Sequence, residues 1–171
     1  CFTPQVTEAR SLADEALNIL RVLIKENPED EQLEVAFADG LTDLAMIEIQ
    51  LRNFESAENW LNQARALNQQ ALVEFPNSEQ IRNNRTRYLF FLILLRGGQL
   101  KPKQALETAA ELRDVGWNPQ KNAYYAACGL ARCVPILKNH AALNKSEQEQ
   151  KSEEYANQAI QFLRRAVRLG Y

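Results

Sequence analysis

The sequence predicts an all-α protein, an α-solenoid built from antiparallel helix pairs, with about seven helices. The first observation is a self-match at a period of 48 residues, in which Ala57 falls on Ala9 in one direction and on Ala105 in the other. The second is that each repeat holds two amphipathic runs with helical spacing, separated by a turn at Pro28 or Pro76. The third is that no stretch alternates polar and apolar residues as a strand does.

Length and composition fit one helical-repeat domain that covers residues 1–171. Of the 171 residues 46% are hydrophobic, and a chain of this length buries roughly 70% of its unfolded surface. The net charge of -2 favours neither nucleic acid nor an anionic membrane as a partner. The longest apolar run, Leu89–Leu95, is much shorter than the roughly 20 residues of a membrane-spanning helix. We therefore expect no nucleic-acid partner and no membrane insertion.

The first residue, Cys1, is not a methionine, and the single methionine of the chain is Met46. We therefore expect the chain to be an excised fragment of a longer protein. No signal peptide is visible, so we expect a cytoplasmic location.

Caps and prolines predict the limits of the first two helices. Thr3 is a hydroxyl cap followed by Pro4 at the first helical position, and the helix that they open ends before Pro28. The second helix is expected over residues 31–51. It contains Gly40, which is unfavourable in a helix by about 1 kcal/mol, so we expect close packing against the preceding helix there.

The third and fourth helices are predicted in the same way. Asn53 is expected to cap the third helix, which ends at the next proline turn. Asn77 and Gln80 have the spacing of a capping box for the fourth helix. That helix is expected to end at Gly97 and Gly98, the strongest stop signal in the chain.

Three shorter signals predict the remaining helices. A proline-initiated fifth helix is expected over residues 102–114. A cap followed by proline opens a sixth helix over residues 118–138, in which Pro135 should kink or fray the last turn. Ser146 and Glu149 have the spacing of a capping box for the last helix.

One segment is similar to a tetratricopeptide unit. The residues that carry this resemblance are Leu44, Ala45, Asn53, Phe54, Ala57, Leu61 and Ala64. In that family small residues at fixed positions let two helices approach closely. The resemblance implies a right-handed superhelix that binds proteins. The chain departs from the family in its period of 48 residues rather than about 34, and in Arg52, which stands where a glycine is usual.

The second half has a narrower resemblance. Gly116–Cys133 and Tyr155–Tyr171 look like the closing repeats of tetratricopeptide regions in bacterial serine/threonine protein kinases. The segments Tyr124–Cys128 and Arg164–Val167 carry the match. This resemblance implies a signalling protein as the parent, although the chain itself contains no kinase catalytic motif.

By alignment with the tetratricopeptide family, the inner face of the first helices predicts a peptide-binding groove. Its residues are Thr42, Met46, Ile49, Arg87, Phe90, Leu94, Tyr125 and Arg132. An apolar groove with basic flanks suits an extended or helical peptide. The other interpretation is that Phe90 and Leu94 belong to the core.

A cluster of arginines marks the fourth helix. Arg82, Arg85 and Arg87 lie near its start and Arg96 near its end. They are typical of a solvated helix face, or they bind an anionic partner such as an acidic peptide or a phosphorylated segment.

Candidates for catalysis and metal binding are weak. His140, the single histidine, lies in a polar loop with no acid near it in the sequence. Cys128 and Cys133 are five residues apart on a predicted helix, which places them about 140° apart around its axis. This is poor geometry for sharing a metal, so we interpret them as small residues at a helix contact. We expect no cofactor.

The sequence therefore predicts a non-catalytic protein-interaction or scaffold module. A helical ligand-binding or enzymatic domain is the rival, and a deep, closed pocket with convergent polar groups would favour it. A structural spacer or dimerisation element is a third possibility. The sequence does not predict the oligomeric state.

Overall fold

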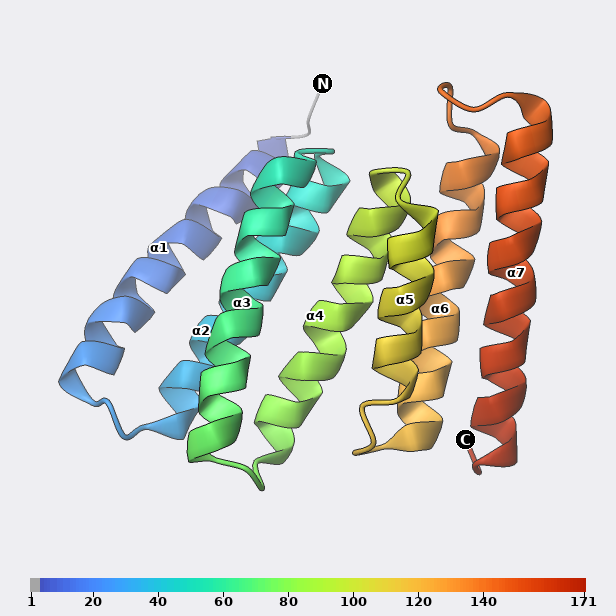
Figure 1. Ribbon diagram of the computed structural model, residues 1–171. Coiled ribbons are helices and arrows are strands. Elements are labelled where there is room, and N and C mark those ends of the chain that lie inside the picture. The colour runs from blue at the N-terminus through green and yellow to red at the C-terminus, as the bar shows by residue number, and fades with distance from the viewer. Residues whose placement is uncertain (1–3) are drawn as a thin grey trace. The chain divides into compact units, whose positions relative to one another are not determined.

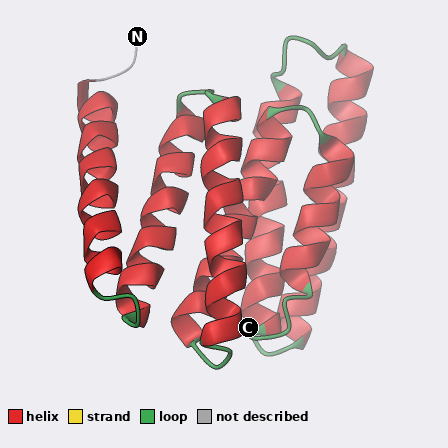
Figure 2. Ribbon diagram, turned by 60° about the vertical axis from the view of Figure 1, so that its left-hand side comes forward, coloured by secondary structure: helices red, strands yellow, loops and turns green. Residues whose placement is uncertain are grey.

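The structure is a computed structural model that describes the backbone of residues 4–171 and the side chains from residue 7 onward. Within that range it contains seven α-helices and no strand, as Figure 2 shows by colour. The helices are labelled in Figure 1 and comprise α1 (Pro4–Glu26), α2 (Glu31–Gln50), α3 (Phe54–Glu74), α4 (Glu79–Gly98), α5 (Pro102–Arg113), α6 (Pro119–Lys138) and α7 (Lys145–Arg168). The predicted all-α class is confirmed, whereas the stacking of repeats into a solenoid stays a prediction. Among the described helices, none is long and apolar enough to cross a membrane.

Several predicted helix ends are confirmed in detail. The Asn118 side chain accepts a hydrogen bond from the backbone N–H of Lys121 at 3.2 Å, which caps α6. Helix α6 continues through Pro135 to Lys138, and the Asn139 side chain donates to the Pro135 carbonyl at 2.9 Å. The predicted cap at Thr3 lies outside the described residues.

The predicted cap of α4 is wrong by one residue. Helix α4 begins at Glu79, and the Ser78 hydroxyl accepts a hydrogen bond from the Ile81 N–H at 3.3 Å. The expected capping box of Asn77 and Gln80 therefore does not form. Two adjacent polar residues can each cap a helix, and the length of the turn after the proline selects the second.

The predicted cap of α7 is also wrong. Asn144 and Glu147 form a reciprocal capping box, in which each side chain accepts a hydrogen bond from the other residue's backbone N–H at 3.0 Å. Ser146 and Glu149 were expected in these places. The helix begins one residue before Ser146, so this serine already lies within its first turn.

Internal contacts divide the chain into two compact units, one that ends at Tyr88 and one that spans Leu89–Tyr171. Helix α4 contributes its first half to the first unit and its second half to the second. Within each unit, consecutive helices run in opposite directions, as Figure 1 shows.

The core of the first unit lies between α1, α2 and α3. It is built from Leu17, Leu41, Leu44 and Ala64, all of which are buried. A Cβ atom added to Gly40 would lie 2.7 Å from Cδ2 of Leu17, so the Leu17 side chain packs in the space that a larger residue at position 40 would take. The close contact predicted from Gly40 is confirmed.

A buried carboxylate ties α1, α2 and the following turn together. Glu48 is fully buried, lies 3.0 Å from Nη2 of Arg10 and accepts a hydrogen bond from the Asn53 side chain at 2.8 Å. Because Asn53 is used in this way, its side chain does not cap α3, contrary to the expectation. The neighbouring Arg52 has a φ of 59°, in the left-handed region that favours glycine.

Two side-chain amides attach the first half of α4 to its neighbours. Asn68 of α3 is buried and donates to the Ile81 carbonyl at 2.6 Å. Asn84 of α4 donates to the Val35 carbonyl of α2 at 3.1 Å. These bonds cross between helices, so they fix the position of α4 in this unit more specifically than apolar contact alone.

The alanines of the self-match differ in their surroundings. Ala57, Ala64 and Ala105 are fully buried, whereas Ala9 and Ala16 of α1 are exposed. Helix α1 packs on α2, and among its side chains from residue 7 onward the buried one is Leu17. The period therefore predicts the helix of residues 4–26 but not the side of it that faces the core.

The second unit packs α5, α6 and α7 through small residues and one buried tyrosine. Ala105 and Ala109 of α5 and Ala126 of α6 are fully buried. The hydroxyl of the buried Tyr155 of α7 donates to the Pro102 carbonyl at 3.2 Å, which links the start of α5 to α7. Burial raises the pKa of Tyr155 well above its usual range, so this hydroxyl keeps its proton.

Candidate functional site

Aromatic rings and cations meet on α4 and α6 of the second unit. The ring of Phe90 lies edge-on to that of Tyr125, with 6.3 Å between their centroids. The guanidinium carbon of Arg132 is 5.4 Å from the Phe90 ring centroid, and Nζ of Lys121 is 5.8 Å from that of Tyr125. Three predicted groove residues are thus brought together, and we call these four residues the α4–α6 aromatic surface.

Helical spacing and two close contacts position this surface. Lys121, Tyr125 and Arg132 follow one another at steps of four and seven residues, so they share one side of α6. A Cβ atom on Gly129 would lie 3.1 Å from Cδ1 of Ile93, so the absence of a side chain at Gly129 lets α6 approach α4. The Phe90 ring can therefore reach a ring and a cation on the neighbouring helix.

The surface continues through further aromatic residues. Tyr124 lies 5.8 Å from Tyr125, whereas Phe91 is buried and packs edge-on against Phe90 from the core side, with 5.4 Å between the ring centroids. Tyr171 at the end of the chain stacks on Tyr124 with a centroid distance of 4.3 Å. Rings packed in this way present a large apolar area whose side chains have already lost most of their rotamer freedom.

The charge of this surface is positive. Neither α6 nor the Leu89–Gly98 half of α4 contains an aspartate or a glutamate. On α5 and after it, Asp114 is paired with Arg113 and lies 3.5 Å from Arg165, and the hydrogen bond from Arg113 lowers the pKa of Asp114. A ligand at the surface would therefore meet Lys121 and Arg132 without a carboxylate from their own helices.

The remaining groove residue of the second unit is Leu94. It is half-buried on α4, one turn beyond Phe90. Phe90 is half-buried as well, so each contributes both to packing and to the accessible surface. The sequence left open whether these two residues belong to a groove or to the core, and their partial burial fits both.

The groove residues of α2 lie in the first unit and differ in accessibility. Thr42 is buried, and its hydroxyl donates to the Ala38 carbonyl at 2.9 Å. It is therefore committed to its own helix. Met46 and Ile49 are half-buried.

Arg87 is held by two carboxylates of its own unit. Its Nη1 lies 2.7 Å from Asp39, and its Nη2 forms a second ion pair with Asp43. Burial raises the pKa of Asp43, the charge of Asp39 adds to this effect, and Arg87 opposes it. An acidic partner would have to compete with both carboxylates for Arg87, which weakens its predicted role as an anchor.

Two more arginines of the predicted cluster form hydrogen bonds with residues close to them in the sequence. Arg82 donates through Nη2 to the Pro76 carbonyl in the turn before α4. Arg96 donates to the Gln99 side chain at 3.0 Å, just after the helix ends. These contacts stabilise the ends of α4, as a structural interpretation of the cluster implies.

The two cysteines of α6 are buried to different extents, and His140 lies after the helix. Cys133 is buried, and burial raises its pKa to about 12, so its thiol stays protonated at neutral pH. Cys128 is half-buried on the same helix. His140 accepts a hydrogen bond from the Ala142 N–H through Nδ1 at 3.3 Å. In the part of the chain that the structure describes, no three His, Cys, Asp or Glu side chains gather in a way that could hold a metal ion.

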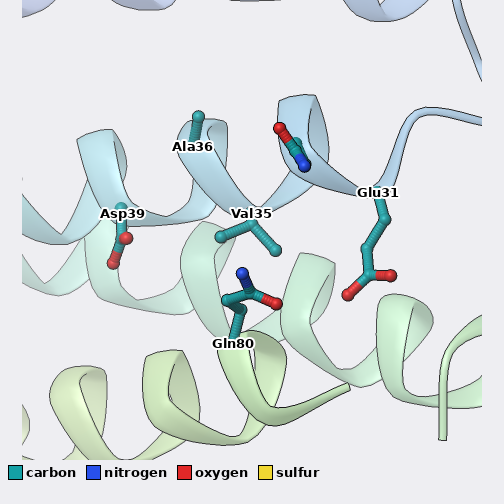
Figure 3. A pocket seen from close by; sticks show the side chains of 6 residues that line it. Glu31, Val35, Ala36, Asp39 and Gln80 are labelled. Carbon is teal, nitrogen blue, oxygen red and sulfur yellow. The ribbon is translucent and has the colours of Figure 1, made fainter. Parts of the chain in front are cut away.

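A hollow of about 310 Å³ lies in the first unit between α2 and the start of α4, as shown in Figure 3. Its walls are Glu31, Gln32, Val35, Ala36, Asp39 and Gln80. Gln32, Ala36 and Gln80 are exposed, and Asp39 is engaged by Arg87. The hollow is therefore open and lined largely by solvated side chains, unlike the closed pocket that would favour a ligand-binding domain.

Sequence reasoning missed Lys121, Tyr124 and Tyr171. Lys121 could have been found, because it precedes Tyr125 by four residues on a predicted helix and therefore lies beside it. Tyr171 could not have been found from the sequence, because its position depends on how the residues after α7 turn back toward α6.

No protein-family model matches the chain, and neither a curated protein nor a solved structure matches it either.

Proposed function

We propose that the chain is a non-catalytic protein-interaction module whose α4–α6 aromatic surface binds an acidic segment of a partner protein. The observation that carries the proposal is the placement of Arg132 over Phe90 and of Lys121 over Tyr125, where neither α6 nor the Leu89–Gly98 half of α4 has a carboxylate. Rings supply apolar area at low entropic cost, and the cations supply charge complementary to aspartate, glutamate or phosphate.

The rings and the cations of this surface are expected to contribute to binding in different ways. Aromatic side chains and arginines are the residues that most often dominate the free energy of a protein interface. Lys121 is half-buried and Arg132 is exposed, so their charges are screened by salt and act mainly on the rate of association. We therefore expect moderate affinity, with binding that weakens as salt is added.

The resemblance to tetratricopeptide units supports a binding role rather than a catalytic one. In that comparison Phe90, Tyr125 and Arg132 belong to the face that contacts peptides. We leave Arg87 out of the proposed surface because Asp39 and Asp43 already offset its charge. The corresponding role of Thr42, Met46 and Ile49 stays a prediction.

The parent of the module is proposed to be a bacterial signalling protein such as a serine/threonine kinase. The support is the similarity of Tyr124–Cys128 and Arg164–Val167 to closing repeats of such proteins. Sequencing the gene on both sides of this segment tests it. Kinase catalytic motifs in the same reading frame are expected, and a complete reading frame without them would contradict the proposal.

Peptide arrays test the binding function directly. The chain is applied to short acidic peptides that contain one aromatic or leucine residue, and to the same peptides with lysine in place of each acidic residue. We expect retention on the acidic set only, and affinities measured by fluorescence polarisation should fall as salt rises. Retention on the basic set, or equal retention on both, would contradict the proposal.

Variants locate the binding to the proposed surface. Arg132→Glu and Lys121→Glu reverse a charge on it, and each should weaken acidic-peptide binding by about tenfold. Lys138→Glu is the matched control, since it makes the same charge change at an exposed position on the same helix. Phe90→Leu keeps an apolar side chain but removes the ring, and it should weaken binding while circular dichroism stays unchanged. Equal losses in the three charge-reversal variants, with no loss in Phe90→Leu, would show that only net charge matters and would contradict the proposed surface.

A further inference from the structure

The outward side of α1 carries an unpartnered apolar ridge. Leu12, Ile19 and Val22 are 60%, 55% and 55% exposed. Their spacing of seven and three residues places them on one side of the helix, opposite the buried Leu17. Large apolar residues aligned in this way are a common mark of a protein contact.

Acidic residues accompany the α1 ridge. Glu8, Glu15 and Glu26 follow the same helical spacing and are exposed. Of the basic residues of α1, Arg10 is instead turned to the buried Glu48 and Arg21 lies over the Phe37 ring of α2, while Lys25 stands in the last turn. The outward side of α1 is therefore both apolar and negative.

The last third of α7 has a matching ridge on its outward side, where the charge is opposite, whereas the exposed Glu149 and Glu153 lie on the same side nearer the start of the helix. Ile160, Leu163 and Val167 are 46%, 41% and 66% exposed. Arg164 and Arg168 are exposed beside them. Arg165 is turned away to Asp114, at 3.5 Å, so the ridge has its own arginines in addition to the one used inside the unit.

We infer that the two ridges bind each other between copies of this chain, with α7 of one copy packing antiparallel on α1 of the next. In this register Ile160 lies opposite Ile19 and Val167 lies opposite Leu12. The same register brings Arg164 opposite Glu15 and Arg168 within reach of Glu8. It also places Glu153 opposite Glu26 at the far end of the contact, so the favourable charge pairs lie near the start of α1.

The parallel arrangement is less favourable. If Ile160 lies opposite Leu12 and Val167 opposite Ile19, Arg164 meets Ala16 and no carboxylate. Antiparallel helices also align their dipoles favourably. Charge and dipole thus select the same orientation.

The contact uses two different surfaces and is therefore heterologous. A contact of this type repeats from one copy to the next and gives open chains unless the rotation closes a ring. The average mass should rise beyond that of a dimer as the protein concentration increases. The contact shares no residue with the α4–α6 aromatic surface, so the two proposals fail or succeed separately.

Sedimentation velocity on the 171-residue chain tests this inference. The wild type should show a weight-average mass that rises with concentration and falls with added salt. Arg164→Glu with Arg168→Glu, and separately Glu8→Lys with Glu15→Lys, should each weaken association by about tenfold. Arg65→Glu with Lys138→Glu is the matched control, because both residues are exposed and lie on other helices.

A mixture of the two charge-reversed proteins provides the decisive outcome. Every contact between unlike proteins then pairs opposite charges, so association should return to the wild-type level. A wild type that stays monomeric at all concentrations would overturn the inference. Association that survives in Arg164→Glu with Arg168→Glu, as a contact between two α7 helices would allow, would overturn it as well. Association that does not return in the mixture would also overturn it, because the reversed charges would then not face each other.

Discussion

The guanidinium of Arg132 lies over the ring of Phe90, with its central carbon 5.4 Å from the ring centroid. A cation–π contact at an accessible site contributes about 0.5–1 kcal/mol. We expect Phe90→Leu and Arg132→Gln to be coupled by about this amount in a double-mutant cycle of urea unfolding. Additive effects would show that the cation and the ring are independent, and Tyr125→Leu with Arg132→Gln serves as the control pair.

Gly97 and Cys133 test how closely α4 and α6 approach each other. A Cβ atom on Gly97 would overlap Sγ of Cys133, which is buried and lies 3.7 Å from the Ile93 carbonyl. We expect Gly97→Ala to destabilise the protein by about 1–3 kcal/mol through overpacking. Adding Cys133→Ala should recover part of this loss, because it removes the atom that overlaps. A double variant less stable than either single variant would contradict this packing.

The backbone conformation of Arg52 is expected to destabilise the folded protein. Its φ of 59° costs a non-glycine residue about 1 kcal/mol, and its side chain is exposed. We expect Arg52→Gly to raise the free energy of unfolding by about 0.5–1 kcal/mol. Arg52→Ala removes the same side chain without relieving the backbone, so it is the control. Equal stability of the two variants in urea would contradict the prediction.

Asp43 and Asp114 are expected to respond to pH in opposite directions. Burial raises the pKa of Asp43, so the folded chain takes up its proton more readily than the unfolded chain, and its contribution to stability improves as the pH falls toward the ordinary value of 3.8. The hydrogen bond from Arg113 lowers the pKa of Asp114. Its contribution is therefore present above pH 3.8 and is lost as the pH falls through the lowered value.

Urea unfolding between about pH 6 and about pH 3 separates the two effects. The free energy of unfolding of the wild type, relative to Asp43→Asn, should increase as the pH falls. Relative to Asp114→Asn it should decrease, and by a small amount because Asp114 is exposed. Two differences that change in the same direction would contradict the assignment.

Prolines, glycines and caps made most of the helices predictable, because these residues act locally. Two of the three wrong caps fall where neighbouring residues compete, Ser78 with Asn77 and Asn144 with Ser146. Their capping strengths are similar, so the path of the preceding turn decides between them. That path depends on packing, which no local pattern contains. The third, at Asn53, is lost because its side chain bonds to Glu48 instead.

The candidate site was predictable in part. Alignment with the tetratricopeptide family placed Phe90, Tyr125 and Arg132 on one face, and the structure brings the three side chains together. Their role in binding stays a prediction. The pairing of Arg87 with Asp39 was missed, although the two residues are one repeat of 48 apart and so occupy equivalent positions on α2 and α4. An ion pair between equivalent positions depends on the distance between the two helices, and the period alone does not give it.

Nuclear magnetic resonance of the ¹⁵N-labelled chain, titrated with an acidic peptide retained by the array, tests the binding proposal most directly. We expect the largest amide shift changes in Leu89–Gly98 and between Lys121 and Arg132. In Arg132→Glu the same changes should need about tenfold more peptide, while the rest of the spectrum stays intact. Shift changes centred on other helices, or unaltered changes in Arg132→Glu, would contradict the α4–α6 aromatic surface as the binding site.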